Sequence, residues 1–137
     1  TDRELFECAV KNTPKLFPCE IMPMKSALRE MLQELEEMGE DIAGKLDQII
    51  PMMILTNSRK TYGACCIMYP KGSVGGDYYL IPSSVHEFIL LPLSQGRSAE
   101  ELKEMIAEVN SSEIPPEDVL SDSLYLYSCK ERCVKIL

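Results

Sequence analysis

The stretch at residues 78–92, YYLIPSSVHEFILLP, decides the fold of this chain. Two apolar runs flank a Pro-Ser-Ser corner, and the second run is apolar on both of its faces. The pattern predicts two strands, at residues 78–81 and 85–91. A strand that is apolar on both faces is covered on both sides, so we expect the second one at the centre of a sheet. Pro92 ends it, because proline cannot donate a hydrogen bond to a neighbouring strand.

Further strands are predicted on either side of this pair. The apolar runs at residues 51–56 and 61–69 flank a polar turn, and together they predict a hairpin. Alternation over residues 123–129 places Tyr125 and Tyr127 on one face of a strand, and residues 133–137 form the last one. The glycine-rich segment 70–77 is expected to be a loop, and its glycines lack the spacing of a phosphate-binding loop.

Helices are predicted mainly in the first third of the chain. Residues 1–11 begin with a Thr1–Glu4 capping box and carry an apolar face. That face contains Leu5, Cys8 and Ala9, with Phe6 and Val10 beside it. Residues 12–23 contain three prolines and are expected to break regular structure.

A second helix is predicted at residues 24–38, ending at Gly39, and a short third one at residues 40–50. The second helix has a stripe at helical spacing, formed by Met24, Leu28, Met31, Leu32, Leu35 and Met38. Methionine-rich stripes serve either as adaptable partner grooves or as ordinary core, and we interpret this one as core.

The best-marked helix is predicted at residues 98–109, where Ser98 and Glu101 form a capping box. Its buried stripe consists of Leu102, Met105, Ile106 and Val109. Pro115 and Pro116 then start one helical turn at residues 117–120. The order of helices and strands favours the α+β class: a mainly antiparallel sheet of about five or six strands with helices packed on one side.

Composition narrows the class of protein. The 137 residues are expected to form a single domain, and the abrupt helical start predicts the later part of a longer protein. The 22 acidic and 14 basic residues leave a net charge of −8, which repels nucleic acid and anionic lipid. No apolar run approaches the roughly 20 residues of a membrane helix, so no membrane partner is expected. The six cysteines are expected to be free, mostly buried thiols of a cytoplasmic protein.

The corner at residues 82–87 holds the candidate site residues: Ser83, Ser84, His86 and Glu87. A zinc-protease motif needs a second histidine four residues after His86, where Leu90 stands. A serine nucleophile with His86 as its base would need the glycines of a nucleophile elbow, which are missing. We therefore interpret His86 and Glu87 as groups that hydrogen-bond around the corner, and we assign no catalytic, cofactor or metal residue.

Two cysteine pairs and an acidic cluster are further candidates for a reactive thiol or a metal site. Cys65 or Cys66 would become a reactive thiolate beside His86, and Cys129 and Cys133 would need outside ligands to hold a metal. An acidic cluster near the double proline does not match the calcium-loop pattern; it comprises Glu113, Glu117, Asp118 and Asp122. The ordinary explanations are buried free cysteines and a solvated acidic surface, and we prefer them.

Several strings resemble an uncharacterised bacterial family, a domain of unknown function. The most specific is residues 81–87, IPSSVHE; the others are residues 12–14, 55–57, 62–64, 68–70, 109–110 and 119–122. The resemblance implies a cytoplasmic bacterial protein that extends further at its N-terminus, and it transfers no activity. Members of that family carry a helix between the Tyr-Pro string and the next strand, where this chain has residues 70–77.

Two hypotheses about function follow. The first is a non-enzymatic domain that binds a protein partner or a small ligand without a cofactor. The second is a hydrolase or a thiol-dependent enzyme with its site around His86. They differ in whether the imidazole meets a hydroxyl or thiol in a pocket, or is bonded to the backbone.

Overall fold

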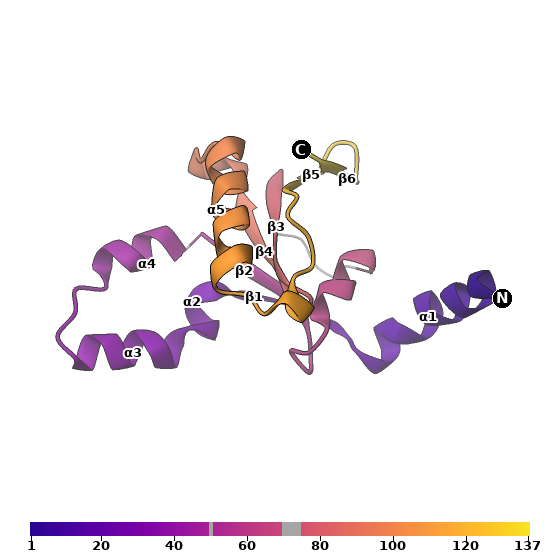
Figure 1. Cartoon of the computed structure of the whole chain (residues 1–137), viewed down its shortest axis with the longest axis horizontal. Coiled ribbons are helices and arrows are strands. Elements are labelled where there is room, and N and C mark those ends of the chain that lie inside the picture. Colours follow the sequence, from indigo (N-terminus) through magenta and orange to yellow (C-terminus); the bar gives the residue numbers. More distant parts are fainter. Residues whose placement is uncertain (50, 70–74) are drawn as a thin grey trace.

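Six antiparallel strands form one sheet in the order β1-β2-β4-β3-β5-β6 (Figure 1). The computed structural model describes residues 1–49, 51–69 and 75–137. The strands are β1 (Cys19–Pro23), β2 (Met53–Asn57), β3 (Tyr78–Ser84), β4 (Glu87–Pro92), β5 (Tyr125–Ser128) and β6 (Cys133–Ile136). The predicted α+β class with an antiparallel sheet is confirmed.

The central position of β4 is also confirmed. It pairs with β2 on one side and with β3 on the other. Phe88 and Leu90 point to one face of the sheet, and Ile89 and Leu91 point to the opposite face, because side chains alternate along a strand. Both faces are therefore covered at this strand, which is why residues 88–91 are apolar on both faces.

Helix α5 (Ala99–Ser112) covers one face of the sheet (Figure 1). Its Leu102 and Ile106 are buried against side chains of the sheet and of the segment before β5, namely Ile81, Leu91 and Leu124. The predicted capping box of Ser98 and Glu101 is present, since each side chain accepts from the other's backbone N–H. The helix runs three residues further than the stripe indicated.

The opposite face is covered by η1, a 3-10 helix at Gly63–Met68. Its Ala64 and Cys66 pack on Leu55, Leu80, Phe88 and Leu90. The predicted strand at residues 61–69 and the predicted hairpin with residues 51–56 are therefore wrong. Lys60 and Tyr62 have positive φ angles, +55° and +52°, and turn the chain away from β2 and over the sheet.

Helix α1 (Asp2–Leu16) begins with the predicted Thr1–Glu4 capping box but does not end at residue 11. It passes through Pro14, so the predicted break over residues 12–23 is wrong for its first part. A proline this close to the last turn removes only one of the helical hydrogen bonds. None of the residues of α1 is buried, and its apolar face is exposed.

The rest of the predicted break also has structure, because Cys19–Pro23 forms the edge strand β1 and pairs with β2. The predicted helix at residues 24–38 is divided at Leu28 into α2 (Met24–Ala27) and α3 (Arg29–Glu37). Of its stripe only Met24 and Leu32 are buried, and Met38 is 76% exposed, so its interpretation as core is largely wrong. Gly39 ends the helix with a φ of +80°, as predicted.

Helix α4 (Ala43–Ile49) follows within the predicted range. Helices α3 and α4 extend from one end of the molecule and α1 from the other (Figure 1). The predicted loop at residues 70–77 lies mostly outside the described residues. The same holds for the position where the resembling family carries a helix. None of the helices in the described ranges is long and apolar enough to cross a membrane.

Candidate functional site

The candidate residues lie at the β3–β4 connection, whose turn begins three residues later than predicted, at Val85 instead of Pro82. Pro82, Ser83 and Ser84 belong to β3, and Val85 and His86 form the turn. Three other segments are bonded to the backbone of this turn. Val85 N–H donates to Asp118 O (2.8 Å), Ala64 N–H donates to Val85 O (3.2 Å), and Thr56 Oγ1 donates to His86 O (2.9 Å). The turn is therefore a junction of the fold.

The imidazole of His86 is held between two of these segments. The backbone N–H of Tyr62 donates to its Nδ1 (3.0 Å), so the ring proton of the neutral form is on Nε2. Nε2 lies 3.4 Å from Asp118 Oδ1 on η3 (Pro116–Asp118), and both side chains are about one-third exposed. Both ring nitrogens thus face a partner, and neither partner is a hydroxyl or a thiol.

The two serines do not meet the imidazole. Ser84 Oγ is buried and accepts the backbone N–H of His86 (3.1 Å). Ser83 Oγ donates to Glu87 Oε1 (3.3 Å). Their hydroxyls are used to shape the turn and not to approach a base. The structure therefore brings Ser83 and Glu87 together in one pair and His86 and Asp118 in another.

The thiols of η1 lie around Tyr69 and not around His86. Cys65 Sγ and Cys66 Sγ are 3.5 and 3.4 Å from the phenolic oxygen of Tyr69, which donates to Phe17 O (2.9 Å). Cys66 is fully buried, and burial raises the pKa of its thiol to about 12. A thiol with such a pKa stays protonated near neutral pH and is a poor nucleophile.

All six cysteines are free, but the expectation that they are mostly buried is wrong. Cys8, Cys65 and Cys129 are exposed, and only Cys66 is buried. Cys133 Sγ donates to Glu131, and Asp122 accepts from Asn110. In the described ranges, no three of the histidine, cysteine and acidic side chains are grouped so that they could hold a metal ion.

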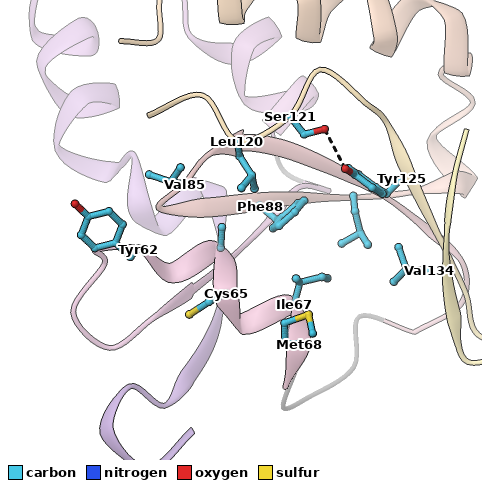
Figure 2. A pocket seen from close by; sticks show the side chains of 12 residues that line it. Tyr62, Cys65, Ile67, Met68, Val85, Phe88, Leu120, Ser121, Tyr125 and Val134 are labelled. Atoms are coloured by element: carbon cyan, nitrogen blue, oxygen red, sulfur yellow. Dashed lines mark hydrogen bonds between the residues drawn. The ribbon is translucent and has the colours of Figure 1, made fainter. Parts of the chain in front are cut away.

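A pocket of about 610 Å³ opens on the face of the sheet that η1 covers (Figure 2). Its floor contains the buried side chains of Ala64, Leu80 and Phe88, and its rim contains the exposed Tyr62 and Leu120. The other lining residues are Cys65, Ile67, Met68, Val85, Ser121, Tyr125 and Val134. Figure 2 shows Tyr62 at one end and Val134 at the other.

One hydroxyl pair interrupts this apolar wall. Ser121 Oγ and Tyr125 Oη lie 2.9 Å apart, joined by the hydrogen bond drawn in Figure 2. Ser121 Oγ also accepts the backbone N–H of Ser123 (3.0 Å). The two hydroxyls carry two protons and share one of them, so the pair keeps one proton to donate to a further acceptor. The wall can therefore orient a ligand that carries a single polar group.

His86 is connected to this pocket through Tyr62. The backbone of Tyr62 is left-handed, which is costly for a residue with a Cβ unless its surroundings hold it there. The bond from Tyr62 N–H to His86 Nδ1 supplies such a restraint, and the two rings lie 5.3 Å apart. His86 thus fixes the position of a side chain at the rim of the pocket.

Residues 1–129 match the family of unknown function DUF5688. The chain belongs to this family. No curated protein and no solved structure matches it. The matched range contains the β3–β4 turn, Asp118 and every lining residue of the pocket except Val134, so the DUF5688 match covers the site region.

Sequence reasoning located the turn of this DUF5688 chain and missed the pocket. The lining residues come from residues 62–68, β3, the β3–β4 turn, β4, residues 120–121, β5 and β6, and each one looks like an ordinary core or surface residue. Asp118 was counted among solvated acids, although it faces His86 from 32 positions further along the chain. One local pattern did point to the pocket wall. The alternation over residues 123–129 predicts that Tyr125 and Tyr127 share a face of β5, and both pack on the side of the sheet that η1 covers.

Proposed function

We propose that this chain is a non-enzymatic binding domain whose pocket takes a small apolar molecule with one hydrogen-bonding group. The observation that carries the proposal is the lining: an apolar floor and rim with a single hydroxyl pair, Ser121 and Tyr125. The volume of about 610 Å³ falls within the range of about 300–1,000 Å³ that is usual for sites of small ligands. A concave, apolar pocket of this kind supports a small molecule over a flat protein partner.

The engagement of His86 supports a binding function over a hydrolase or thiol-dependent enzyme. Its Nδ1 accepts a backbone N–H, and its Nε2 faces a carboxylate. A general base needs a free nitrogen within hydrogen-bond reach of the proton that it removes. The buried thiol of Cys66 has a raised pKa, which disfavours a thiolate mechanism as well.

The test is fluorescence titration with Nile red, a neutral apolar dye. Leu120 lies at the rim and is 40% exposed, so Leu120→Lys places a charge at the opening with little cost to folding. We expect the variant to bind the dye roughly tenfold more weakly or worse, because the charge would have to be buried with the ligand.

The matched control is Leu5→Lys on α1, where Leu5 is 71% exposed and is not among the residues that line the pocket. We expect this variant to bind the dye as the wild type does if the pocket is the site. Equal affinity in wild type and Leu120→Lys would contradict the proposal, and so would a hydrolytic or thiol-transfer activity that is lost in His86→Ala.

We further propose that the protein is bacterial and cytoplasmic and that these residues form one domain. The family strings around residues 81–87 support the origin. The free thiols are usual in a reducing compartment. One sheet that includes strands from both halves of the chain supports a single domain. A mass-spectrometric count of free thiols after purification from its native cells without reductant tests the compartment.

A further inference from the structure

Helix α1 has an apolar face that nothing in the described parts of the chain covers. No residue of this helix is buried, and its large apolar side chains are 49–71% exposed: Leu5, Phe6, Val10 and Leu16. Figure 1 shows α1 extending away from the sheet at one end of the molecule. An isolated helix of 15 residues is only marginally stable in water. We therefore expect the apolar face of α1 to be packed against another chain segment.

The residues on that face are arranged for contact with another helix. At 100° per residue, Leu5, Ala9 and Leu16 lie along its centre, with Phe6 and Val10 on one border and Cys8 on the other. Two polar residues, Asp2 and Asn12, also lie on this face near its two ends. The small side chain of Ala9 is near the middle of α1. A small residue at that point lets a second helix approach closely, while the larger side chains on either side fill the space around the crossing.

The charges of α1 decide the direction of such a partner helix. Its first half, residues 2–8, contains three acidic side chains and one basic one, for a net charge of −2. Its second half, residues 9–16, contains Lys11 and Lys15 and has a net charge of +2. At 100° per residue most of these charges lie on the back of the helix, but Glu4 and Lys15 lie together along one border of the apolar face. An antiparallel copy places Glu4 of one helix beside Lys15 of the other, whereas a parallel copy brings the two like-charged halves together.

We propose that α1 pairs antiparallel with the α1 helix of a second copy of this chain, in a two-fold symmetric dimer. A self-complementary patch is what a two-fold interface requires, because both copies offer the same residues. The charges of the helix are balanced, three acidic and three basic, so an anionic membrane surface gains no electrostatic attraction from it. The interface is separate from the pocket lining, and the proposal is independent of the pocket's ligand.

The first test is sedimentation equilibrium of the 137-residue chain over a micromolar-to-millimolar concentration series. We expect a monomer–dimer equilibrium for the wild type, and association weakened roughly tenfold or more in Leu5→Lys, which puts a charge on the centre line of the apolar face, one turn from Ala9. Ile136→Lys on β6 is the matched control, because Ile136 is 70% exposed and Leu5 is 71% exposed. We expect this control to associate as the wild type does.

The second test addresses direction. K11E/K15E makes both halves of the helix acidic, and D2K/E7K makes both halves basic. We expect each double variant alone to be monomeric and an equimolar mixture to form the heterodimer. Antiparallel pairing also places the two Cys8 side chains on the same side near the two-fold axis, so mild oxidation of the wild type should cross-link Cys8 to Cys8, ahead of Cys129, which is also exposed.

A single monomeric species over the whole concentration range overturns the proposal and leaves another segment or another protein as the cover. A dimer that Leu5→Lys does not weaken also overturns it. A dimer whose charge variants fail to form the mixed species overturns the antiparallel arrangement. The dye titration reads the affinity of Leu120→Lys, and the sedimentation experiment reads the association of Leu5→Lys. Because these are separate measurements on different variants, each proposal can fail without the other.

Discussion

Replacing Gly63 by alanine should be among the most damaging single changes in this protein. A Cβ at this position would lie 2.5 Å from the carbonyl oxygen of His86 and 2.7 Å from the backbone nitrogen of Asn57, and it would overlap Thr56 Oγ1. Two of these three neighbours are backbone atoms of β2 and of the β3–β4 turn, which cannot move independently of the sheet.

The magnitude follows from two losses. Forcing an extra methyl group into a packed site costs about 1–3 kcal/mol. Displacing Thr56 Oγ1 also removes its hydrogen bond to His86 O, which contributes about 1 kcal/mol. We therefore expect Gly63→Ala to lower the free energy of unfolding by about 2–4 kcal/mol, a large fraction of the roughly 5–15 kcal/mol that stabilises a typical domain. The melting temperature should fall by roughly 10 °C.

Urea denaturation followed by circular dichroism measures the effect, and Gly44→Ala is the matched control. Gly44 lies in α4, and a Cβ added there meets nothing within 4 Å. Alanine is the better helix former, so the control should be neutral or stabilised by up to about 1 kcal/mol. If Gly63→Ala unfolds within about 0.5 kcal/mol of the wild type, η1 does not approach the turn as closely as described.

Three further predictions concern single contacts. His86→Ala leaves the N–H of Tyr62 without its acceptor and should lower the free energy of unfolding by about 1–2 kcal/mol in urea titrations; an unchanged value would remove His86 from its positioning role. Ser98→Ala removes the cap of α5 and should cost about 1 kcal/mol, whereas Ser112→Ala at the other end should cost little; equal costs would contradict the capping argument. Burial raises the pKa of Cys66 from 9.0 to about 12, so the folded chain retains a proton that the unfolded chain loses. Stability from this group is present below about pH 9 and falls as the pH rises towards 12, and denaturation midpoints at alkaline pH should fall less steeply in Cys66→Ala.

Elements that depend on local chemistry were predictable from the sequence. The capping boxes at Thr1 and Ser98 need only residues three positions apart, and both are present. The apolar faces of β4 report its burial directly, because a strand inside a sheet needs no polar side. In these cases the stabilising partner is a near neighbour or the whole core, and the pattern alone identifies it.

Elements that depend on distant partners were not predictable. Residues 61–69 have the composition of a strand, yet the left-handed Tyr62 and the contact of Gly63 with the β3–β4 turn make them a 3-10 helix. The edge strand β1 is short and ends in Pro23, and it is a strand only because β2 pairs with it. The apolar periodicity correctly predicted the helix α1. Periodicity does not say whether the apolar face of a helix is covered by the rest of the same fold, and that of α1 is exposed.

The candidate site shows the same division. The β3–β4 turn was located because proline, serine and histidine stand together in the sequence. The His86–Asp118 contact and the pocket lining join segments tens of residues apart, and no spacing rule connects them. Ser83 and Ser84 have polar side chains beside a histidine in the sequence, but alternation along β3 gives their hydroxyls different partners.

The pairing of β1 with β2 has a consequence for how this chain tolerates changes in length. The chain leaves the sheet after Pro23 and re-enters it at Met53, and these two residues are direct partners in the ladder. The helices α2, α3 and α4 are therefore the contents of one enlarged hairpin loop. Closing a longer loop costs only about 0.6 kcal/mol for each doubling of its length. Insertions and deletions should accumulate in this loop and leave the register of the six strands unchanged, which makes it the natural place to splice in a reporter domain.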